Sequence, residues 1–291
     1  MTLSEARFVP RELVAAIRPR VPDAARFEGL WVCGDIAPLA GTTVAIVGSR
    51  APTAAGWRLA HDTAQRLAAA GTCILSGLAL GIDGAAHAGA IAAAAPTIGI
   101  LGGGHLFFHP RRNRGLAERM IAGGGAVLSP YAPDAPAYPS QFLQRNGVVA
   151  ALADAVVIVE AAARSGALNT ASWAADLGVP VFAFPGDVDR PKVAGCLALL
   201  RDGATLVRGA DDVLADLGIH GVGAPLATAA ARTDLEVRIL RSLADGEMDG
   251  DDLAERARAP AAETLSALTQ LELDGIVERR PGRRYARLRP S

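Results

Sequence analysis

Short apolar runs alternate with helical segments through most of this 291-residue chain, from Thr43 to about Gly218. The runs that predict strands are Val44–Val47, Thr72–Leu75, Thr97–Leu101, Ala126–Leu128, Ala155–Val159, Val179–Phe184 and Thr205–Val207. Helical periodicity fills the gaps, at Ala54–Ala70, Gly84–Ala94, Asn113–Ala122, Gln141–Leu152, Ala167–Leu177 and Cys196–Arg201. Because the runs are apolar on both faces, they favour a parallel sheet covered by helices on both sides. The pattern therefore predicts a doubly wound α/β domain with a mostly parallel sheet.

The segments around this domain complete the predicted organisation of the chain. Residues 1–40 are proline-punctuated and mixed in charge, and we interpret them as a helical or irregular lead-in packed on the domain of residues 41–218. The small residues of 219–231 predict a linker. Residues 232–291 carry three amphipathic helical segments followed by two short strands, which predicts a small C-terminal winged-helix domain.

One dipeptide on its own favours a different local structure. Asn146-Gly147 is typical of a β-hairpin turn. Here it lies among Phe142, Val149 and other apolar residues that recur at helical spacing. We therefore predict a helix with an interior glycine.

The overall charge limits how the chain could contact nucleic acid. The net charge is −1, so any such contact must come from a local basic patch. The positive charge is almost entirely arginine, and Lys192 is the only lysine. This composition argues against a lysine-based catalyst anywhere except position 192.

Cysteine usage and hydropathy indicate the compartment. Cys33, Cys73 and Cys196 are odd in number and form no C-x-x-C pair, so we expect reduced, buried thiols. The N-terminus has no signal-peptide core, and the longest apolar region is interrupted by Asp83 and His87. We therefore expect a cytoplasmic protein with no membrane span.

The turns after the strands are the first places to seek a site, because ligands of open parallel sheets bind beyond the carboxyl ends of the strands. Gly48 and Ser49 follow the first strand of the domain and let the backbone approach a ligand, while Arg50 offers a planar fork suited to phosphate. Ser165 and Gly166 form a second phosphate-friendly turn before a helix. The alternative for the first turn is a tight turn with a solvated arginine.

The stretch after the third strand of the domain mixes basic and aromatic side chains. It contains Phe107, Phe108, Arg111, Arg112 and Arg114. Arginines interleaved with aromatic rings suit phosphates and stacked bases. The alternative is a glycine-rich loop whose phenylalanines belong to the core.

Candidates for catalysis are weak. Asp83 and His87 could suggest acid–base or metal chemistry, but no second histidine accompanies them, and we favour a helix cap and a packed imidazole. Glu160 lies at a strand end without a paired carboxylate. The phosphate-loop motif G-x-x-x-x-G-K-[ST] and the dinucleotide motif G-x-G-x-x-G are both absent at the required place. We therefore predict polyanion binding without catalytic residues, metal or cofactor.

Five stretches, by their order and spacing, resemble the bacterial DNA-processing protein A family, also called Smf. They are "VAIVGSR", "SGLALGIDGAAH", "RRNRGLAERM", "FLQRNGVVAALADAVVIVEAAARSGALNTA" and "PVFAFPGDV". The resemblance runs from about Trp31 to Gly218 and resumes in the C-terminal domain. It implies an extended Rossmann-like domain that binds single-stranded DNA and forms a homodimer. It also implies that the protein loads the RecA recombinase onto that DNA during natural transformation.

The resemblance also implies the residues of the site. Arg50 matches the arginine of the family's Gly-Ser-Arg turn, and we expect Arg50, Arg114 and Arg145 to meet successive phosphates. Phe142 or Phe108 would stack bases. The full set of expected DNA-binding residues is Gly48, Ser49, Arg50, Arg112, Arg114, Phe142, Arg145, Asn146, Ser165, Gly166 and Lys192.

One residue and one tripeptide depart from the family pattern. Gly147 stands where a further basic residue usually follows the Arg-Asn pair. Gly195, Cys196 and Leu197 stand where the family usually has Gly-Thr-Asn or a relative. These departures favour weaker DNA binding on one side of the expected pocket.

The C-terminal domain has an uneven charge. Its last segment is crowded with arginines, namely Arg279, Arg280, Arg283, Arg284, Arg287 and Arg289. This density suggests a phosphate-facing surface, although a solvated tail or a protein docking module would also account for it. The expected recognition helix, Ala261–Asp274, carries three acids and no arginine. We therefore expect only weak duplex contact here and no sequence-specific base reading.

Two other functions remain open on the same scaffold. Related Rossmann-like proteins cleave nucleotides at the N-glycosidic bond, but they carry a P-G-G-x-G-T-x-x-E turn where this chain has "ARSGALNTA". A transcription regulator that senses a nucleotide is the third candidate, and the acidic recognition helix counts against it.

Overall fold

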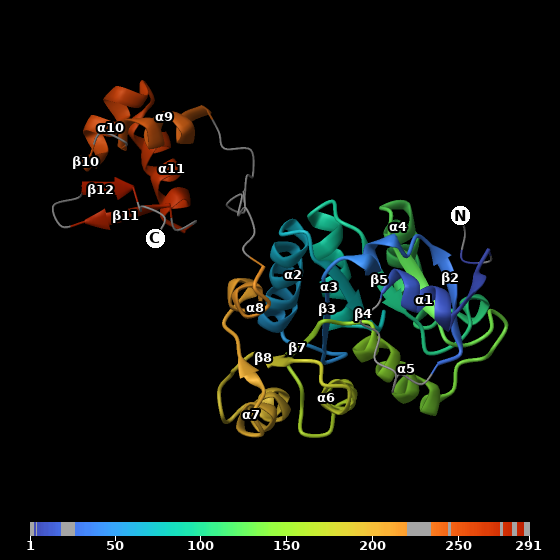
Figure 1. Ribbon diagram of the computed structural model, residues 1–291. Helices are drawn as coiled ribbons and strands as arrows, with labels where there is room; N and C mark the ends of the chain where they lie inside the picture. The colour runs from blue at the N-terminus through green and yellow to red at the C-terminus, as the bar shows by residue number, and fades with distance from the viewer. Residues whose placement is uncertain are drawn as a thin grey trace. The chain divides into compact units, whose positions relative to one another are not determined.

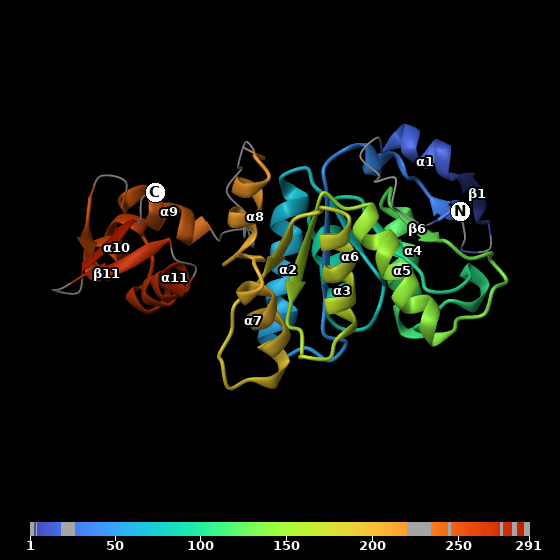
Figure 2. The same cartoon turned by 60° about the horizontal axis from the view of Figure 1, so that its bottom comes forward.

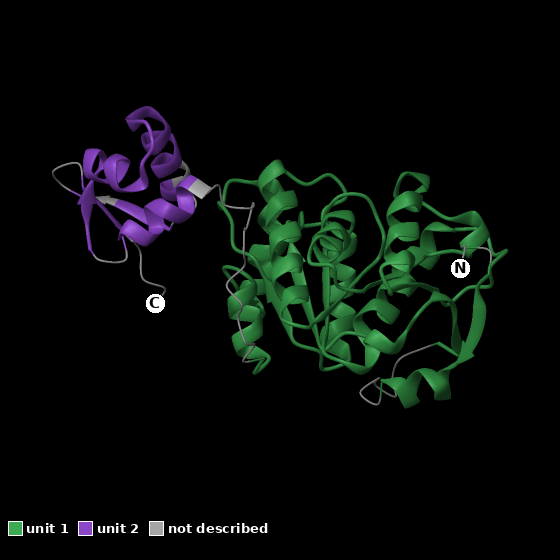
Figure 3. Cartoon of the chain, turned by 90° about the horizontal axis from the view of Figure 1, so that it is seen from above, with its two compact units in different colours: residues 1–223 green, residues 224–291 purple. Residues whose placement is uncertain are grey.

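The computed structural model describes Leu3 and residues 5–18, 27–219, 234–243, 246–273, 276–280 and 284–287. The chain divides into two compact units, residues 1–223 and residues 224–291 (Figure 3). Most of the predicted linker, residues 219–231, lies outside the described residues.

Unit 1 is built on a nine-stranded sheet with the order β1-β2-β6-β5-β4-β3-β7-β8-β9 (Figure 1). The strands are β1 (Arg7–Pro10), β2 (Gly29–Gly34), β3 (Thr43–Gly48), β4 (Cys73–Ser76), β5 (Thr97–Ile100), β6 (Ala126–Ser129), β7 (Ala155–Val159), β8 (Val181–Ala183) and β9 (Thr205–Leu206). Neighbouring strands from β6 to β9 pair in parallel, as the two-sided apolar runs require. The predicted doubly wound, Rossmann-like sheet is confirmed.

Helices cover both faces of this sheet (Figures 1 and 2). They are α1 (Arg11–Ile17), α2 (Ala54–Ala69), α3 (Ile82–Ala92), α4 (Arg114–Ala122), α5 (Pro139–Ala151), α6 (Gly166–Asp176), α7 (Ala194–Arg201) and α8 (Ala210–Asp216). Side chains of successive strand residues point to opposite faces, so Val44 and Ile46 pack with α2, α3 and α8, whereas Ala45 and Val47 pack with α5 and α6. Short 3-10 turns lie in the connections, at η1 (Ala37–Ala40), η2 (His105–Phe107), η3 (Arg111–Asn113) and η4 (Pro191–Val193).

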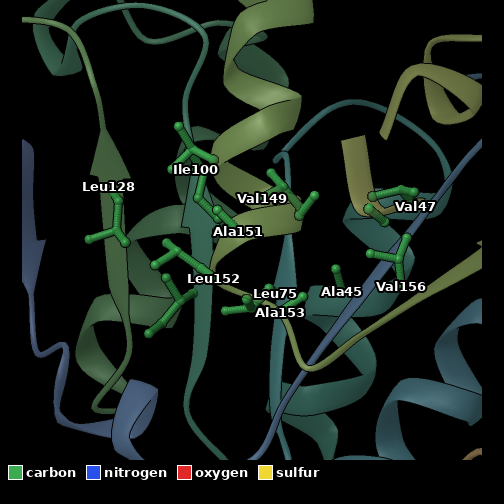
Figure 4. Packing of buried hydrophobic residues seen from close by; sticks show 14 of the residues in the cluster. Ala45, Val47, Leu75, Ile100, Leu128, Val149, Ala151, Leu152, Ala153 and Val156 are labelled. Carbon is green, nitrogen blue, oxygen red and sulfur yellow. The ribbon is translucent and has the colours of Figure 1, made fainter. Parts of the chain in front are cut away.

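The C-terminal half of α5 lies on the centre of the sheet (Figure 4). Val149 and Ala151 lie beside Ile100 of β5, and Leu152 is fully buried in the same cluster as Leu128 of β6. The helix runs through Asn146 and Gly147 without interruption, so the prediction of a helix there is confirmed. This packing fixes the N-terminal half of α5 above the carboxyl ends of the strands.

The N-terminal segment contains strands that the sequence did not predict. β1 and β2 extend the sheet by antiparallel pairing, β2 with β6 and β1 with β2. The expectation of a helical or irregular lead-in is therefore wrong for these residues, although α1 is helical. Because β1 is a four-residue edge strand that ends at Pro10 and is largely exposed, it shows little apolar periodicity. The seven-residue helix α8 was also missed.

Unit 2 contains three helices and a three-stranded sheet among its described residues. They are α9 (Asp234–Ser242), β10 (Met248–Asp249), α10 (Gly250–Ala257), α11 (Ala261–Leu273), β11 (Val277–Arg280) and β12 (Arg284–Arg287). The sheet order is β10-β12-β11, with both pairings antiparallel. Ile239, Leu253, Leu268 and Tyr285 meet in a core of this unit's own. The predicted winged helix is confirmed, with β10 as a strand the sequence did not predict.

The three cysteines are buried thiols, as the sequence predicts. Burial raises the pKa of each thiol, to about 12 for Cys73, so the thiols are neutral. No helix within the described ranges combines the length and apolar character needed to cross a membrane.

His87 is a packed core residue on α3, as its apolar setting predicts. Its Nδ1 lies 2.8 Å from the Thr97 hydroxyl, which itself donates to the Ile74 carbonyl at 2.7 Å. The hydroxyl has a single proton, so Nδ1 of the imidazole donates to it. Burial, reinforced by the charge of Arg145, lowers the pKa of His87 to about 3. The imidazole is therefore neutral in the folded protein at neutral pH.

This buried imidazole makes folding stability depend on pH. The folded pKa of His87 lies below the unfolded value of about 6.5, so only the unfolded chain binds the proton between those limits. We expect His87 to account for a loss of about 2 kcal/mol in unfolding free energy between pH 7 and pH 5. Urea unfolding of the parent and of His87→Gln at both pH values measures this contribution.

The comparison uses the pH-dependent difference, because Gln also alters packing. His105 is buried too and its pKa is lowered, so the variant retains part of the pH dependence. Equal losses between pH 7 and pH 5 in parent and variant would contradict a neutral, buried His87.

Candidate nucleic-acid interface

The turn after β3 is clamped between two neighbouring elements. The N–H of Ser49 donates to the Glu160 carbonyl after β7 at 2.7 Å, and the Ser49 carbonyl accepts from Ile82 of α3 at 3.1 Å. A Cβ at Gly48 would overlap the Val159 carbonyl, so this close approach requires glycine. The clamped turn leaves Arg50 exposed at the edge of the sheet.

A pocket of about 540 Å³ opens beside this turn, at the point between β3 and β7 where the strand order reverses. We refer to it as the switch-point pocket. Of the predicted site residues, the structure brings together in its lining Gly48, Ser49, Arg50, Phe142, Arg145, Asn146, Ser165 and Gly166. They come from the end of β3, the N-terminal half of α5 and the turn before α6. Open α/β sheets bind ligands at this position.

At the mouth of the pocket a cation lies over an aromatic ring. The guanidinium carbon of Arg50 is 5.8 Å from the centroid of the Phe142 ring, and His109 meets the same ring edge-on at 5.9 Å. Phe142 is only partly buried. The pair therefore offers a phosphate ligand and a base-stacking surface side by side.

Arg145 forms the floor of the pocket instead of projecting into solvent. It is 3% exposed, and its Nη1 donates to the carbonyls of Gly77 and Ile100, at the ends of β4 and β5. Burial lowers the pKa of Arg145 to about 10, so the guanidinium keeps its charge at neutral pH. Its Nε has no hydrogen-bond partner within the described part of the chain. The geometry makes Arg145 a source of positive potential beneath the pocket.

Gly77 lies between Arg145 and a buried carboxylate. Its carbonyl accepts from Arg145, while its N–H donates to Oδ2 of Asp83 at 3.1 Å, and Ala79 N–H donates to the same oxygen at 3.2 Å. Burial raises the pKa of Asp83, and the nearby Arg145 opposes that rise. A Cβ at Gly77 would overlap the guanidinium, so only glycine fits here. Asp83 thus holds the loop after β4 instead of capping α3 with its side chain, contrary to the sequence prediction.

The opposite wall is the start of α6. The Ser165 hydroxyl caps the helix by accepting from Ala167 N–H at 3.2 Å, and Gly166 is exposed. Asn146 on α5 donates to the Gly166 carbonyl and to Oδ1 of Asn169, both at 3.2 Å, and so fixes this turn against α5. Leu168 N–H donates to the Ser165 carbonyl at 3.1 Å, so the Gly166 N–H and the helix dipole remain to suit an anion.

Gly147 allows α5 and α6 to approach closely. A Cβ at this position would lie 3.1 Å from the Trp173 ring of α6. The helices lie side by side (Figures 1 and 2). The departure expected at Gly147 therefore coincides with a packing contact.

Three predicted residues lie outside the switch-point pocket. Arg112 lines a neighbouring groove, and Arg114 at the start of α4 is paired with Glu118 at 3.4 Å. Lys192 donates from Nζ to the Ala51 carbonyl at 2.6 Å and lines a separate cavity of about 550 Å³. Their contact with DNA stays a prediction.

Phe108 is not available to a base. The side chain is 4% exposed and packs with Leu101, Leu116 and Met120 beneath α4. The alternative that the sequence left open, a core phenylalanine, holds for Phe108. The sequence also missed Trp57 and Arg119, which line the groove with Arg112.

The carboxylate at the end of β7 is occupied. Glu160 accepts from the Thr53 N–H at 2.8 Å and from the Thr53 hydroxyl. Its role in the described structure is to fix the start of α2. No cluster of three or more His, Cys, Asp or Glu side chains that could hold a metal ion occurs among the described residues.

Two of the arginines in the wing of unit 2 are paired with acids. Arg280 lies 2.5 Å from Glu278, and Arg284 lies 3.5 Å from Glu247. Arg283, Arg289 and the side chains of Arg279 and Arg287 lie outside the described residues. These pairs reduce the positive charge that the sequence suggests for the wing.

The fold and the pocket together define the class of protein. It has a Rossmann-like domain with an arginine-bearing pocket at the switch point of its sheet, followed by a winged-helix unit. Residues 19–218 match the family described as DNA recombination-mediator protein A, and residues 223–283 match the DprA winged helix domain. The chain belongs to the DNA recombination-mediator protein A family.

Individual relatives agree with this assignment. Protein Smf of Escherichia coli (strain K12) is 36% identical over 294 residues, which cover 98% of this chain and 76% of that protein. Putative DNA processing protein DprA of Mycobacterium tuberculosis (strain ATCC 25618 / H37Rv) is 39% identical over 265 residues, covering 87% of this chain and 67% of that protein.

Two solved structures share the fold. DNA processing protein A from Streptococcus pneumoniae superposes with a TM-score of 0.66 at 32% identity, over 74% of this chain and 75% of that chain. DNA processing protein A from Helicobacter pylori, for which a single-stranded DNA binding mode is described, gives a TM-score of 0.62 at 29% identity. That match covers 75% of this chain and 98% of the other.

The buried charge at the floor of the pocket leads to a stability prediction. Arg145→Met leaves the Gly77 and Ile100 carbonyls without their donor and Asp83 without its nearby cation, so we expect a loss of about 3–5 kcal/mol in unfolding free energy. Adding Asp83→Asn should recover part of that loss. Urea unfolding of the single and double variants measures the coupling.

Arg164→Met is the control, because Arg164 lines the same pocket but is exposed, and its replacement should change stability by less than about 0.5 kcal/mol. Strict additivity of the Arg145 and Asp83 variants would argue against the coupling through Gly77.

Proposed function

We propose that this protein binds single-stranded DNA in the switch-point pocket and acts as a recombination mediator without catalytic turnover. The observation that carries the proposal is Arg50 lying over Phe142 at the mouth of a pocket whose floor is the buried Arg145 cation. The membership of the chain in the DNA recombination-mediator protein A family supports it. The relative from Helicobacter pylori, with its single-stranded DNA binding mode, supports it as well.

The pocket offers protein groups that can contact both the phosphates and the base of a nucleotide. Arg50 would contact a phosphate directly, and the Gly166 N–H at the start of α6 would contact the next one, aided by the helix dipole. The Phe142 ring would stack a base without reading its identity. Because these contacts go to phosphates and to ring faces, we expect binding to single strands of any sequence.

Arg145 would act from below the pocket. Its charge lies in a buried setting, where it is less screened by salt than an exposed charge. Arg145 would attract a phosphate into the pocket while remaining bonded to the Gly77 and Ile100 carbonyls. This division assigns the direct contact to Arg50 and the background potential to Arg145.

The rest of the proposal follows from the family resemblance. We propose that the protein acts in the cytoplasm as a homodimer and loads the RecA recombinase onto incoming single-stranded DNA in natural transformation. The winged helix would add at most a weak contact with duplex DNA, because α11 carries Glu263 and Glu272 and no arginine.

Removal of the exposed cation should weaken binding in a salt-dependent way. For Arg50→Ala we expect lower affinity for all single-stranded sequences to about the same extent. The log–log slope of affinity against salt should become shallower by about 0.7, the value for one phosphate on a single strand. Fluorescence anisotropy titrations of mixed-sequence oligonucleotides at several salt concentrations measure both effects.

Arg201→Ala provides the matched control. Arg201 is an exposed arginine in the last turn of α7, which the crossover topology places at the amino ends of the strands, away from the pocket. Equal affinity of the parent and Arg50→Ala for single strands would refute the assignment of the site. Release of free base from nucleoside monophosphates would instead support a nucleotide-cleaving enzyme.

The mediator role has its own test. On single-stranded DNA covered by a single-strand-binding protein, we expect the parent protein to shorten the lag before RecA hydrolyses ATP. Arg50→Ala should shorten it much less, because loading requires the DNA contact. A lag that the parent protein leaves unchanged, at concentrations where it binds the DNA, would refute RecA loading and leave the DNA site intact.

A further inference from the structure

A second concave surface continues from the switch-point pocket on the other side of Arg50. We call it the α2–α4 groove; its volume is about 700 Å³, and α2, the start of α3, η3 and α4 form its sides. The residues used below are Arg50, Trp57, Gly84, Arg112, Asn113 and Arg119. We propose that this groove binds the segment of the same DNA single strand that extends beyond Arg50. The inference rests on the proposed function and extends its site.

The charge of the groove suits a polyanion. Arg50, Arg112 and Arg119 all line it, and no acidic residue does. Arg112 and Arg119 are exposed, and neither forms an ion pair with any described residue. Arg114 differs, because Glu118 lies 3.4 Å from it. The two unpaired arginines are therefore the stronger phosphate ligands of this region.

The backbone beside Arg112 is anchored by the neighbouring residue, Asn113. The Asn113 side chain donates to the carbonyls of Leu78 and Ala79, both at 2.9 Å, and so ties η3 to the loop between β4 and α3. This loop is the one whose N–H groups bind Asp83. The loop between β4 and α3 thus holds both the groove and the floor of the switch-point pocket in place.

Trp57 supplies an aromatic surface on the opposite side of the groove. Trp57 is 41% exposed, and its ring stacks on the His61 ring with centroids 5.2 Å apart and planes 17° from parallel. A large apolar ring held in this way is a platform on which an unstacked base can lie. A base within a duplex has both faces covered, so the platform favours a single strand over a duplex.

Two features connect the groove to the pocket. Arg50 lines both, so one guanidinium borders the two surfaces. Gly84 also lines the groove and is half-buried, so α3 presents backbone and no side chain to a strand at this point. A DNA strand that passes Arg50 therefore meets Arg112, Arg119 and the Trp57 ring next.

The test compares oligonucleotides of different lengths. Oligothymidylates of about 4, 8 and 16 nucleotides span the site sizes of single-strand-binding folds. For Trp57→Ala we expect affinity for the longest oligonucleotide to fall on the order of tenfold, the effect of losing one stacked base, and affinity for the shortest to stay unchanged. Arg119→Gln should reduce the salt slope for the longest oligonucleotide by about 0.7.

Arg58→Gln is the matched control. Arg58 follows Trp57 on α2, is exposed and lies outside the groove lining, so it loses the same charge without touching the path. Trp57→Phe gives a second measurement that does not depend on the stability of the alanine variant. The longest oligonucleotide should quench the tryptophan emission of the parent and quench that of Trp57→Phe much less.

The outcomes separate this inference from the proposed function. If the longest oligonucleotide binds Trp57→Ala and Arg119→Gln as tightly as the parent, the groove is not part of the path, although Arg50-dependent binding of the shortest one stands. If a duplex of equal length competes as well as the single strand, the groove proposal is overturned in favour of duplex binding. If the parent protein binds none of the oligonucleotides, both proposals fall.

Discussion

The buried guanidinium of Arg145 is the interaction on which the switch-point pocket depends. It joins α5 to the ends of β4 and β5 through the carbonyls of Gly77 and Ile100. The N–H of Gly77 in turn donates to the Asp83 carboxylate on α3. Helices on opposite faces of the sheet are thereby held by one polar network. Because any other position of the guanidinium would leave these two buried carbonyls without their donor, the floor of the pocket has a single well-defined arrangement.

The fold was predictable where strands are buried on both faces. Such strands leave an uninterrupted apolar run, as at β7, where every residue is buried. Edge strands leave no such run: Arg7 and Phe8 of β1 are exposed, and Pro10 ends it. The residues of β1 pair with residues of β2 that are 19 to 25 positions away, as Pro10 with Gly29 and Arg7 with Val32. This pairing decides that Arg7–Pro10 is a strand, and no local pattern carries that information.

The candidate site was predictable to the level of the turns that form it. The rule that ligands bind beyond the carboxyl ends of strands located Arg50 and the turn before α6 correctly in one pocket. Spacing alone could not tell that Arg145 points down to backbone carbonyls, that Phe108 belongs to the core, or that Glu118 pairs with Arg114. Trp57 was missed because it lies inside a helix, away from any strand end.

Lys192 makes selective chemical labelling of this chain straightforward. It is the only lysine in the sequence, and its ammonium group lies 2.6 Å from the Ala51 carbonyl, in the residue next to Arg50. Amine-directed reagents therefore have one side-chain target, with the α-amino group as the other amine. A dye or cross-linker attached to Lys192 would lie beside Ala51, at the border of the switch-point pocket. The protein could therefore be labelled next to its candidate site without an engineered cysteine.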